Sequence, residues 1–212
     1  MAERGKFITL EGGEGCGKST QVKRLTAALE RSGIEVILTR EPGGTILSER
    51  IRTLIKDQDD DPPCDQAELL LFLAARAQLV NEVIRPALAR GAWVISDRFS
   101  DSTLAYQGYG RGMSLDFISA ANDFACAALK PDLTLLLEVS PEIAEARLRE
   151  RETATQTGAD RIERAGDAFH ARLREGFKEL ARQNPTRIVT IDGSGTPEEV
   201  EARIWTSVMR IR

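Results

Sequence analysis

Short apolar runs alternate along the chain with longer stretches in which apolar residues recur every three or four positions. The apolar runs read as strands and cover 6–11, 35–40, 92–97, 133–139 and 187–192. They are apolar almost throughout, which is typical of parallel strands covered on both faces. The segments between them are long enough for right-handed helical crossovers. The pattern therefore predicts an α/β fold, in which helices flank a five-stranded parallel sheet in three layers.

Residues that start and stop helices divide the segments between the strands. The stretch 20–31 has apolar residues at helical spacing. Asp65 is expected to cap a long helix that reaches residue 90 and ends at Gly91. Pro86 lies late in this helix, where we expect a kink.

Later in the chain, Pro141 and the pair Thr196-Pro197 stand where two further helices begin. The acidic stretch 57–65 and the polar stretch 152–159 are predicted to be loops. We find no internal repeat and no linker, so residues 1–212 are expected to form a single domain.

The segment after the first strand fits the phosphate-binding pattern G-x-x-x-x-G-K-[ST]. It consists of Gly12, Gly13, Glu14, Gly15, Cys16, Gly17, Lys18 and Ser19, and Thr20 follows. A strand before the loop and a helix after it are the context that this motif requires. The backbone N–H groups of such a loop form an anion nest at a helix N-terminus. Lys18 is then expected to reach the β- and γ-phosphates and Ser19 to bind Mg²⁺. The alternative is a glycine-rich turn before a helix. We predict a P-loop fold that binds a nucleoside triphosphate through residues 12–20.

Composition narrows the class of protein. The chain has 212 residues, 42% of them hydrophobic, and a net charge of −4, so there is no basic field that would favour nucleic acid. Three cysteines without metal-ligand spacing are expected to be reduced thiols. The first strand begins too early for a signal peptide, and no apolar run is long enough to span a membrane. These features favour a soluble cytoplasmic enzyme or switch.

Charged residues gather where the predicted strands end, which is the edge at which open parallel sheets bind ligands. Asp97 closes an apolar strand as a Walker B carboxylate does, and it is expected to hold Mg²⁺ through water. Glu138 and Glu11 are competing acids, and the alternative for each is a polar strand end without a metal role. Arg98, directly after Asp97, suggests a second phosphate-bearing substrate, because the guanidinium fork grips phosphate. Its alternative is a surface ion pair. Arg40 offers another cation at the same edge.

A cluster of arginines follows the fourth strand and brackets the polar stretch 152–159. It comprises Arg147, Arg149, Arg151, Arg161 and Arg164. A charged helix of this kind is often only a solvated face with i, i+4 ion pairs. Beside a phosphate loop, the segment 147–164 is expected to act as a lid that closes over the transferring phosphoryl group.

Phe72 and Arg76 lie one turn apart on the long helix, where the simple interpretation is a core phenylalanine beside an exposed arginine.

At this point the chain resembles the bacterial thymidylate kinases over nearly its whole length. The resemblance is carried by Phe7-Ile8-Thr9-Leu10-Glu11-Gly12, Thr39-Arg40-Glu41-Pro42-Gly43-Gly44-Thr45, Leu71-Phe72-Leu73-Ala74-Ala75-Arg76, Asp97-Arg98-Phe99, Thr103 with Tyr106-Gln107-Gly108, and Asp160-Arg161-Ile162-Glu163. It implies transfer of the γ-phosphoryl of ATP to dTMP, giving dTDP, with Mg²⁺ and in a homodimer.

The resemblance also assigns site residues. It implies that Phe72 stacks on thymine, that Arg76 binds the carbonyl edge of the base, and that Thr103 and Gln107 lie near it. Tyr106 is implied near the deoxyribose and Glu14 near the 3′-hydroxyl. Arg98 is implied to hold the acceptor phosphate, and the substrate site also includes Arg40 and Pro42.

The loop position that carries an arginine in some members of the family is Gly15 here, so the catalytic arginine is expected in the lid. Arg151 is the best match, followed by Arg149 and Arg161, and the stretch 152–159 is longer than in the usual lid. Two alternatives remain at this stage. One is a kinase for another nucleoside monophosphate, and the other is a GTPase-type switch or ATPase, although no Asn-Lys-x-Asp signature occurs.

Overall fold

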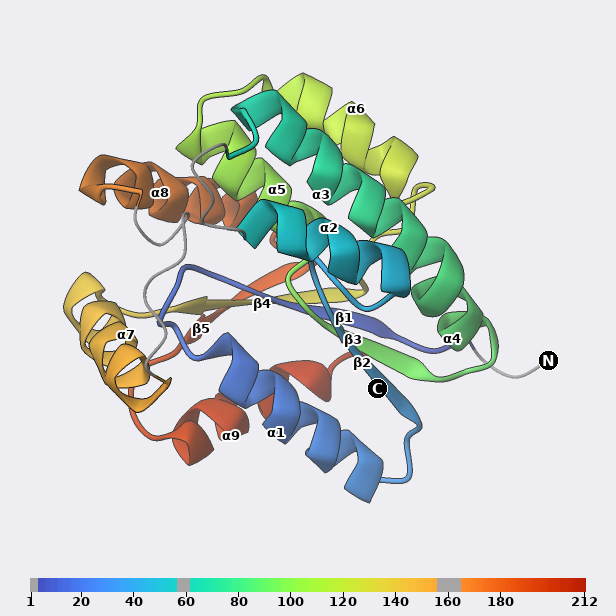
Figure 1. Cartoon of the computed structure of the whole chain (residues 1–212). Helices are drawn as coiled ribbons and strands as arrows, with labels where there is room; N and C mark the ends of the chain where they lie inside the picture. Colours follow the sequence, from blue (N-terminus) through green and yellow to red (C-terminus); the bar gives the residue numbers. More distant parts are fainter. Residues whose placement is uncertain (1–3, 57–61, 156–164) are drawn as a thin grey trace.

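The fold is described here from a computed structural model, in which residues 4–56, 62–155 and 165–212 are placed well enough to describe. The described chain forms one parallel sheet of five strands, in the order β2-β3-β1-β4-β5 (Figure 1). The strands are β1 (Phe7–Glu11), β2 (Val36–Arg40), β3 (Trp93–Asp97), β4 (Leu133–Glu138) and β5 (Ile188–Asp192). Each lies within a residue of the stretch predicted from the sequence, so the predicted sheet is confirmed.

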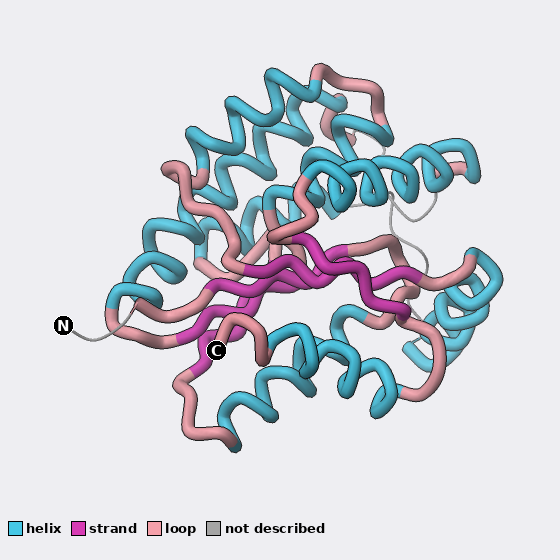
Figure 2. Tube along the Cα trace, turned by 180° about the vertical axis from the view of Figure 1, so that it is seen from behind, coloured by secondary structure: helices cyan, strands magenta, loops and turns pink. Residues whose placement is uncertain are grey.

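Helices cover both faces of the sheet, as the continuous apolar runs predict. On one face lie α1 (Lys18–Arg31) and α9 (Pro197–Val208), which pack on Ile8, Leu10 and Leu135 in the largest buried cluster. On the other lie α3 (Asp65–Leu79), α4 (Arg85–Ala89) and α8 (Asp167–Gln183). Figure 2, from behind, shows the sheet between these two layers. The three-layer arrangement is thereby confirmed.

The long helix predicted over residues 65–90 is continuous, but its geometry changes near Pro86. A π-helical segment, η1 (Val80–Ile84), joins α3 to α4, and Pro86 stands in the first turn of α4. Proline has no N–H to donate, and a π turn is one way in which a helix accommodates that loss. The prediction that Asp65 caps the helix is wrong. Cys64 occupies the cap position, and Asp65 is the first helical residue.

Several helices were not predicted from the pattern. They are α2 (Ile46–Lys56), α5 (Ser100–Thr103), the π-helical segment η2 (Leu104–Gly110) and α6 (Leu115–Ala125). One predicted loop is partly wrong. Helix α7 (Pro141–Thr155) includes the first four residues of the stretch 152–159, because its arginines, glutamates and alanines favour helix. Residues 57–61 and 156–164 lie outside the described part of the chain, so the lid at 147–164 and the single domain stay predictions.

The register of the strands brings the polar strand ends to one edge of the sheet. Leu10 of β1 and Arg40 of β2 both pair with Asp97 of β3. Glu138 of β4 pairs in the same way with Asp192 of β5. The phosphate loop leaves β1 at this edge, so sheet and loop together place the charged residues around one opening. Helix α9 begins beside it with the expected Thr196, which forms a capping box with Glu199.

Candidate active site

The loop between β1 and α1 is wrapped tightly around the ammonium group of Lys18. Its Nζ donates hydrogen bonds to the carbonyl oxygens of Gly12 (3.1 Å) and Gly13 (2.7 Å). Gly12 has φ 136°, and a Cβ there would lie 2.4 Å from the carbonyl oxygen of Leu137. Gly15, with φ 71°, passes equally close to the backbone of Ala144. Only glycine fits these two positions, so the loop can curl inward and point its N–H groups at an anion.

The two residues expected to hold a metal ion come together at the start of α1. Ser19 Oγ donates a hydrogen bond to Asp97 Oδ2 at 2.9 Å, across 78 positions of sequence. A hydroxyl and a carboxylate are oxygen ligands of the type that Mg²⁺ prefers, and Mg²⁺ usually keeps several waters. Within the described residues, no group of three or more His, Cys, Asp or Glu side chains forms a metal cage. The pair therefore fits a cation whose remaining ligands are phosphate oxygens and water.

Arg98 lies between the phosphate loop and the next helix. Its backbone has φ 74°, a left-handed conformation that a residue with a side chain rarely adopts. The guanidinium forms an ion pair with Glu14 and also donates to the Gly12 carbonyl oxygen at 3.1 Å. It lies 4.8 Å from the centre of the Tyr106 ring, within the range of a cation–π contact. Arg98 is thus aimed at the loop and is not a surface ion pair.

Glu14 is held as a carboxylate by its neighbours. Burial by itself would raise its pKa, but the charges of Arg98 and Lys18 and the hydroxyl of Tyr106 outweigh that effect and lower the pKa to about 2. The Tyr106 hydroxyl donates to Glu14 Oε1 at 3.1 Å. The predicted neighbours of the sugar, Glu14 and Tyr106, are therefore joined in one polar group with Arg98.

Glu11 lies below this group, with no exposed surface, and contacts the residues that follow Arg98. It accepts hydrogen bonds from the Phe99 backbone N–H at 2.7 Å and from the Ser102 hydroxyl at 2.5 Å. Burial, followed by the negative charge of Asp101, raises its pKa to about 8. Glu11 supports the unusual backbone at Arg98 and, like Glu138, does not line the cavity described below. Neither of the two competing acids is placed to meet a metal ion there.

The predicted base-binding residues line the other end of the same opening. Phe72 is half-buried, whereas Arg76 is 1% exposed and donates four hydrogen bonds. Two of them go to Glu41 Oε2 at 2.8 and 2.6 Å, one to Asn122 Oδ1 at 2.5 Å and one to the Phe99 carbonyl oxygen at 3.1 Å. The simple interpretation of an exposed arginine is therefore wrong. Arg76 is an anchored, buried cation with one N–H of Nη1 left over from these four bonds.

One cavity of about 680 Å³ joins the two ends of the site. Its lining includes Lys18, Ser19, Asp97 and Arg98 at the phosphate end and the base-end residues Pro42, Phe72, Arg76, Thr103, Tyr106 and Gln107. Arg40 also lines it, and its guanidinium pairs with Glu49 at 3.0 Å. Helix α2 and helix α3 supply one wall and the phosphate loop the other. The residues predicted from distant motifs thus share one opening.

The lid arginines have different environments. Arg149 is 77% exposed and pairs with Glu145 one turn away, which is the solvated-face interpretation. Arg151 lines the cavity. Arg147, to which we gave no separate role, reaches across it and donates to the carbonyl oxygens of Gly193 (3.1 Å) and Gly195 (3.4 Å). Arg161 lies outside the described residues. Helical spacing puts Arg147 and Arg151 on one face of α7, four residues apart, but it does not say which face of the helix meets the cavity.

Other site residues were missed because they act at a distance in sequence. Glu41 holds Arg76, and Glu68 holds Gln107 at 2.9 Å. Glu41 stands inside a quoted motif between Arg40 and Pro42, so the motif could have suggested it. Glu68 stands one turn before Phe72 on α3, and no sequence signal marks it.

Comparison with known proteins points to one family. Residues 10–204 match the family described as thymidylate kinase. The thymidylate kinase of Synechococcus sp. (strain JA-3-3Ab) is 51% identical over 202 residues, covering 95% of this chain and 94% of that protein. That of Pelobacter propionicus is 46% identical over 209 residues, covering 98% and 95%. The solved structure of thymidylate kinase from Ehrlichia chaffeensis, 34% identical, aligns with a TM-score of 0.77 over 97% of this chain and 99% of that one. The predicted P-loop fold is confirmed, and this chain belongs to the thymidylate kinase family.

Proposed function

We propose that this protein transfers the γ-phosphoryl group of ATP to dTMP, giving ADP and dTDP. The observation that carries the proposal is the cavity of about 680 Å³, in which a phosphate loop and a base-binding end stand on either side of Arg98. Such a site can hold two phosphorylated molecules end to end. Held in line, they meet the main requirement of phosphoryl transfer, because positioning and electrostatic stabilisation supply most of the rate.

At the donor end, the loop N–H groups of residues 12–20 bind the phosphates of ATP. Lys18 exchanges its two carbonyl contacts for phosphate oxygens when the loop is filled. Ser19 directly and Asp97 through water would hold Mg²⁺, which would supply positive charge to offset that of the phosphates. The hydrogen bond between these two side chains keeps both oxygens at the mouth of the loop before nucleotide arrives.

At the acceptor end, Arg98 holds the phosphate of dTMP and offsets its repulsion from ATP. This phosphate is already a nucleophilic anion, so no strong general base is required. Glu14 stays ionised because of its low pKa and keeps Arg98 and Tyr106 in place around the sugar. Tyr106 is assigned to the side of the deoxyribose, where it would disfavour a 2′-hydroxyl.

At the base end, Phe72 stacks on thymine and the remaining N–H of Arg76 donates to a carbonyl oxygen of the base. Thr103 and Gln107 border the ring, and Arg40 and Pro42 close the turn beside it. Of the lid arginines, Arg147 and Arg151 both line the cavity. We assign Arg151 to the transferring phosphoryl group, because it is the best match to the family and Arg147 is bonded to the carbonyl oxygens of Gly193 and Gly195. Arg149 is exposed and is given no role at the phosphoryl group. A role for Arg161 stays a prediction.

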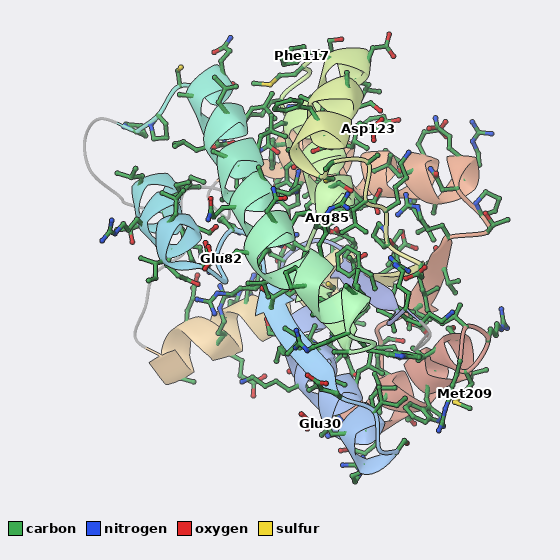
Figure 3. All side chains as sticks on the ribbon, turned by 90° about the vertical axis from the view of Figure 1, so that its right-hand side faces the viewer. Glu30, Glu82, Arg85, Phe117, Asp123 and Met209 are labelled. Atoms are coloured by element: carbon green, nitrogen blue, oxygen red, sulfur yellow. The ribbon has the colours of Figure 1, made fainter. Side chains whose placement is uncertain are left out.

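We also propose that the protein forms a homodimer through α2, α3 and α6. Helix α3 packs between the other two. These helices expose Leu47 (46%), Leu54 (59%), Leu70 (59%), Phe117 (58%) and Phe124 (89%), a set that we call the apolar patch. Phe117 lies at the surface of α6 in Figure 3. Phe124 follows seven residues, or two helical turns, later, so it belongs to the same face of α6. Monomers rarely expose so many large apolar side chains together, and a symmetric second copy would cover them.

A cytoplasmic location is consistent with two further features. None of the described helices is long and apolar enough to cross a membrane. The cysteines Cys16, Cys64 and Cys126 are free thiols, as in reducing compartments. We expect no nucleic-acid partner, given the net charge of −4.

The test is release of ADP from ATP, measured in parallel with dTMP, dUMP, dAMP, dGMP and dCMP, with the product identified by chromatography. We expect rapid formation of dTDP with dTMP and little turnover with the purine monophosphates. A preference for another monophosphate would indicate a different kinase. ATP hydrolysis that is independent of any monophosphate would indicate a switch or an ATPase.

A further inference from the structure

Behind the base end of the cavity lies a buried polar group centred on Glu68, which we call the Glu68 group. The side chain of Glu68 has no exposed surface. It accepts a hydrogen bond from Gln107 Nε2 at 2.9 Å, and from Arg111 Nε and Nη2 at 2.9 Å each. Gln107 lines the cavity, whereas Glu68 and Arg111 do not. Gln107 is therefore the described member of the Glu68 group through which the group can act on the cavity.

The partner of Gln107 decides which end of its amide faces the cavity. An amide has a donor end, Nε2, and an acceptor end, Oε1. The Glu68 carboxylate, in its paired fork with Arg111, can only accept, so Nε2 must face Glu68. Oε1 is then turned away from Glu68, and within the described residues no hydrogen bond to it is found. Gln107 thus presents a hydrogen-bond acceptor to the cavity.

This acceptor stands at the same end of the cavity as Arg76, which presents a donor. Thymine carries a carbonyl oxygen, O4, next to a donor, N3–H. Cytosine carries the reverse pattern, an amino donor beside an acceptor at N3. A donor and an acceptor fixed in this order match thymine or uracil and oppose cytosine. Arg76 cannot change its pattern, because guanidinium only donates, but an amide can turn over.

We propose that Glu68 is a positioning residue that locks the amide of Gln107 with its oxygen toward the base, and so makes the site prefer thymine over cytosine. This inference rests on the proposed function and adds a specificity role that lies outside the cavity. Without Glu68, Gln107 is free to offer either end of its amide, so binding of dCMP should improve while that of dTMP changes little.

The test compares the affinities of dTMP and dCMP by calorimetry, without ATP, in four proteins. They are the wild type, the pair Glu68→Met/Arg111→Met, Gln107→Leu, and all three changes together. Arg111 is 18% exposed and also pairs with the more exposed Asp65 at 2.8 Å. Exchanging both members of a buried ion pair is often close to neutral for stability, and Asp65 stays in contact with solvent, so the paired variant should stay folded. The dTMP preference is the affinity for dTMP divided by the affinity for dCMP, and the paired variant is Glu68→Met/Arg111→Met. Where Gln107 is present, we expect the paired variant to lower this preference about tenfold, because a mismatched hydrogen bond in such a site typically has an effect of that order. In the Gln107→Leu protein, the same pair should change the preference by less than about twofold, because the amide that Glu68 orients is gone.

The outcomes of this comparison separate the role of Glu68 from the proposed function. The role of Glu68 would be overturned if the paired variant left the dTMP preference unchanged, or if it lowered the preference equally with and without the Gln107→Leu change. The proposed function would stand in both cases. Wild-type protein that binds dTMP no better than dCMP would overturn the proposed function and this inference with it. If the paired variant does not fold, Glu68→Gln, which keeps an acceptor for Arg111, is judged by the same comparison, with a smaller decrease expected.

Discussion

The buried ion pair between Arg76 and Glu41 allows stability and substrate binding to be separated by mutation. The side chains are 1% and 4% exposed, and they meet at 2.6 Å. We choose Arg76→Met, which keeps the volume of the side chain and removes its charge. Three acceptors lose their partner, namely the Glu41 carboxylate, Asn122 Oδ1 and the Phe99 carbonyl oxygen.

The expected loss follows from the state of Glu41 after the change. Burial raises its pKa already in the presence of Arg76, whose charge opposes the shift. Breaking a buried pair from one side costs about 3–5 kcal/mol, because an uncompensated charge stays in the core. For a chain of this length, that loss corresponds to a decrease in Tm of about 6–20 °C. The difference from wild type should be smaller at acid pH, where the Glu41 carboxyl takes up a proton.

The assay combines urea unfolding at pH 7 with titration of dTMP. The matched control is Glu41→Met/Arg76→Met, which removes the pair as a whole and should recover at least about 2 kcal/mol of the lost stability. Both variants should bind dTMP about 10- to 150-fold more weakly, because a hydrogen bond from a charged donor is worth about 1.5–3 kcal/mol. If Arg76→Met unfolds within about 1 kcal/mol of wild type, or if the double variant is no more stable than the single one, this account of the pair is wrong.

Three further predictions concern the loop, the patch and the buried acid. Lys18→Ala should lower turnover about a thousandfold or more, which is the scale of key transition-state cations. The control is Lys23→Ala, which changes an exposed lysine on the same helix and should leave turnover near that of wild type. Near-normal turnover of Lys18→Ala would refute the role of Lys18. Phe124→Asp should convert a dimer to a monomer in sedimentation velocity, and an unchanged mass would remove the apolar patch from the proposed interface. Glu11 holds its proton up to about pH 8 in the folded state and releases it near 4.5 when unfolded, so its contribution to stability is present below pH 4.5 and is lost as the pH rises through 8. The free energy of unfolding of Glu11→Gln, measured in urea, should therefore increase relative to that of wild type as the pH rises from 5 to 9. A constant difference between the two proteins over this range would contradict the raised pKa of Glu11.

The elements that the sequence predicted well are those with a strong local cause. The strands are continuous apolar runs, and the phosphate loop needs glycine at two backbone positions, so both can be recognised without tertiary information. The helices α2 and α6 were missed because their apolar residues are divided between the core and the surface. Ile51 and Ile55 are buried, while Leu47 and Leu54 of the same helix are exposed, which blurs the amphipathic pattern.

In the candidate site, too, some residues could be predicted from the sequence and others could not. Residues that meet substrate stand in short motifs and were assigned by resemblance to a family. Their supports, Glu41 and Glu68, were not assigned, because each acts on a partner about 35 or more positions away. The environment of Arg76 was misjudged for this reason, since helical spacing says nothing about a carboxylate that comes from the turn after β2.

The central claim is that one cavity holds both nucleotides with their phosphates facing each other between Lys18 and Arg98. The most direct measurement is a crystal structure of the protein with dTMP and a non-hydrolysable analogue of ATP. We expect the thymine ring on Phe72, the dTMP phosphate on Arg98 and the terminal phosphate of the analogue on Lys18, with the two phosphates in line. A thymidine ligand bound at any other place, or phosphates that do not face each other, would contradict the account.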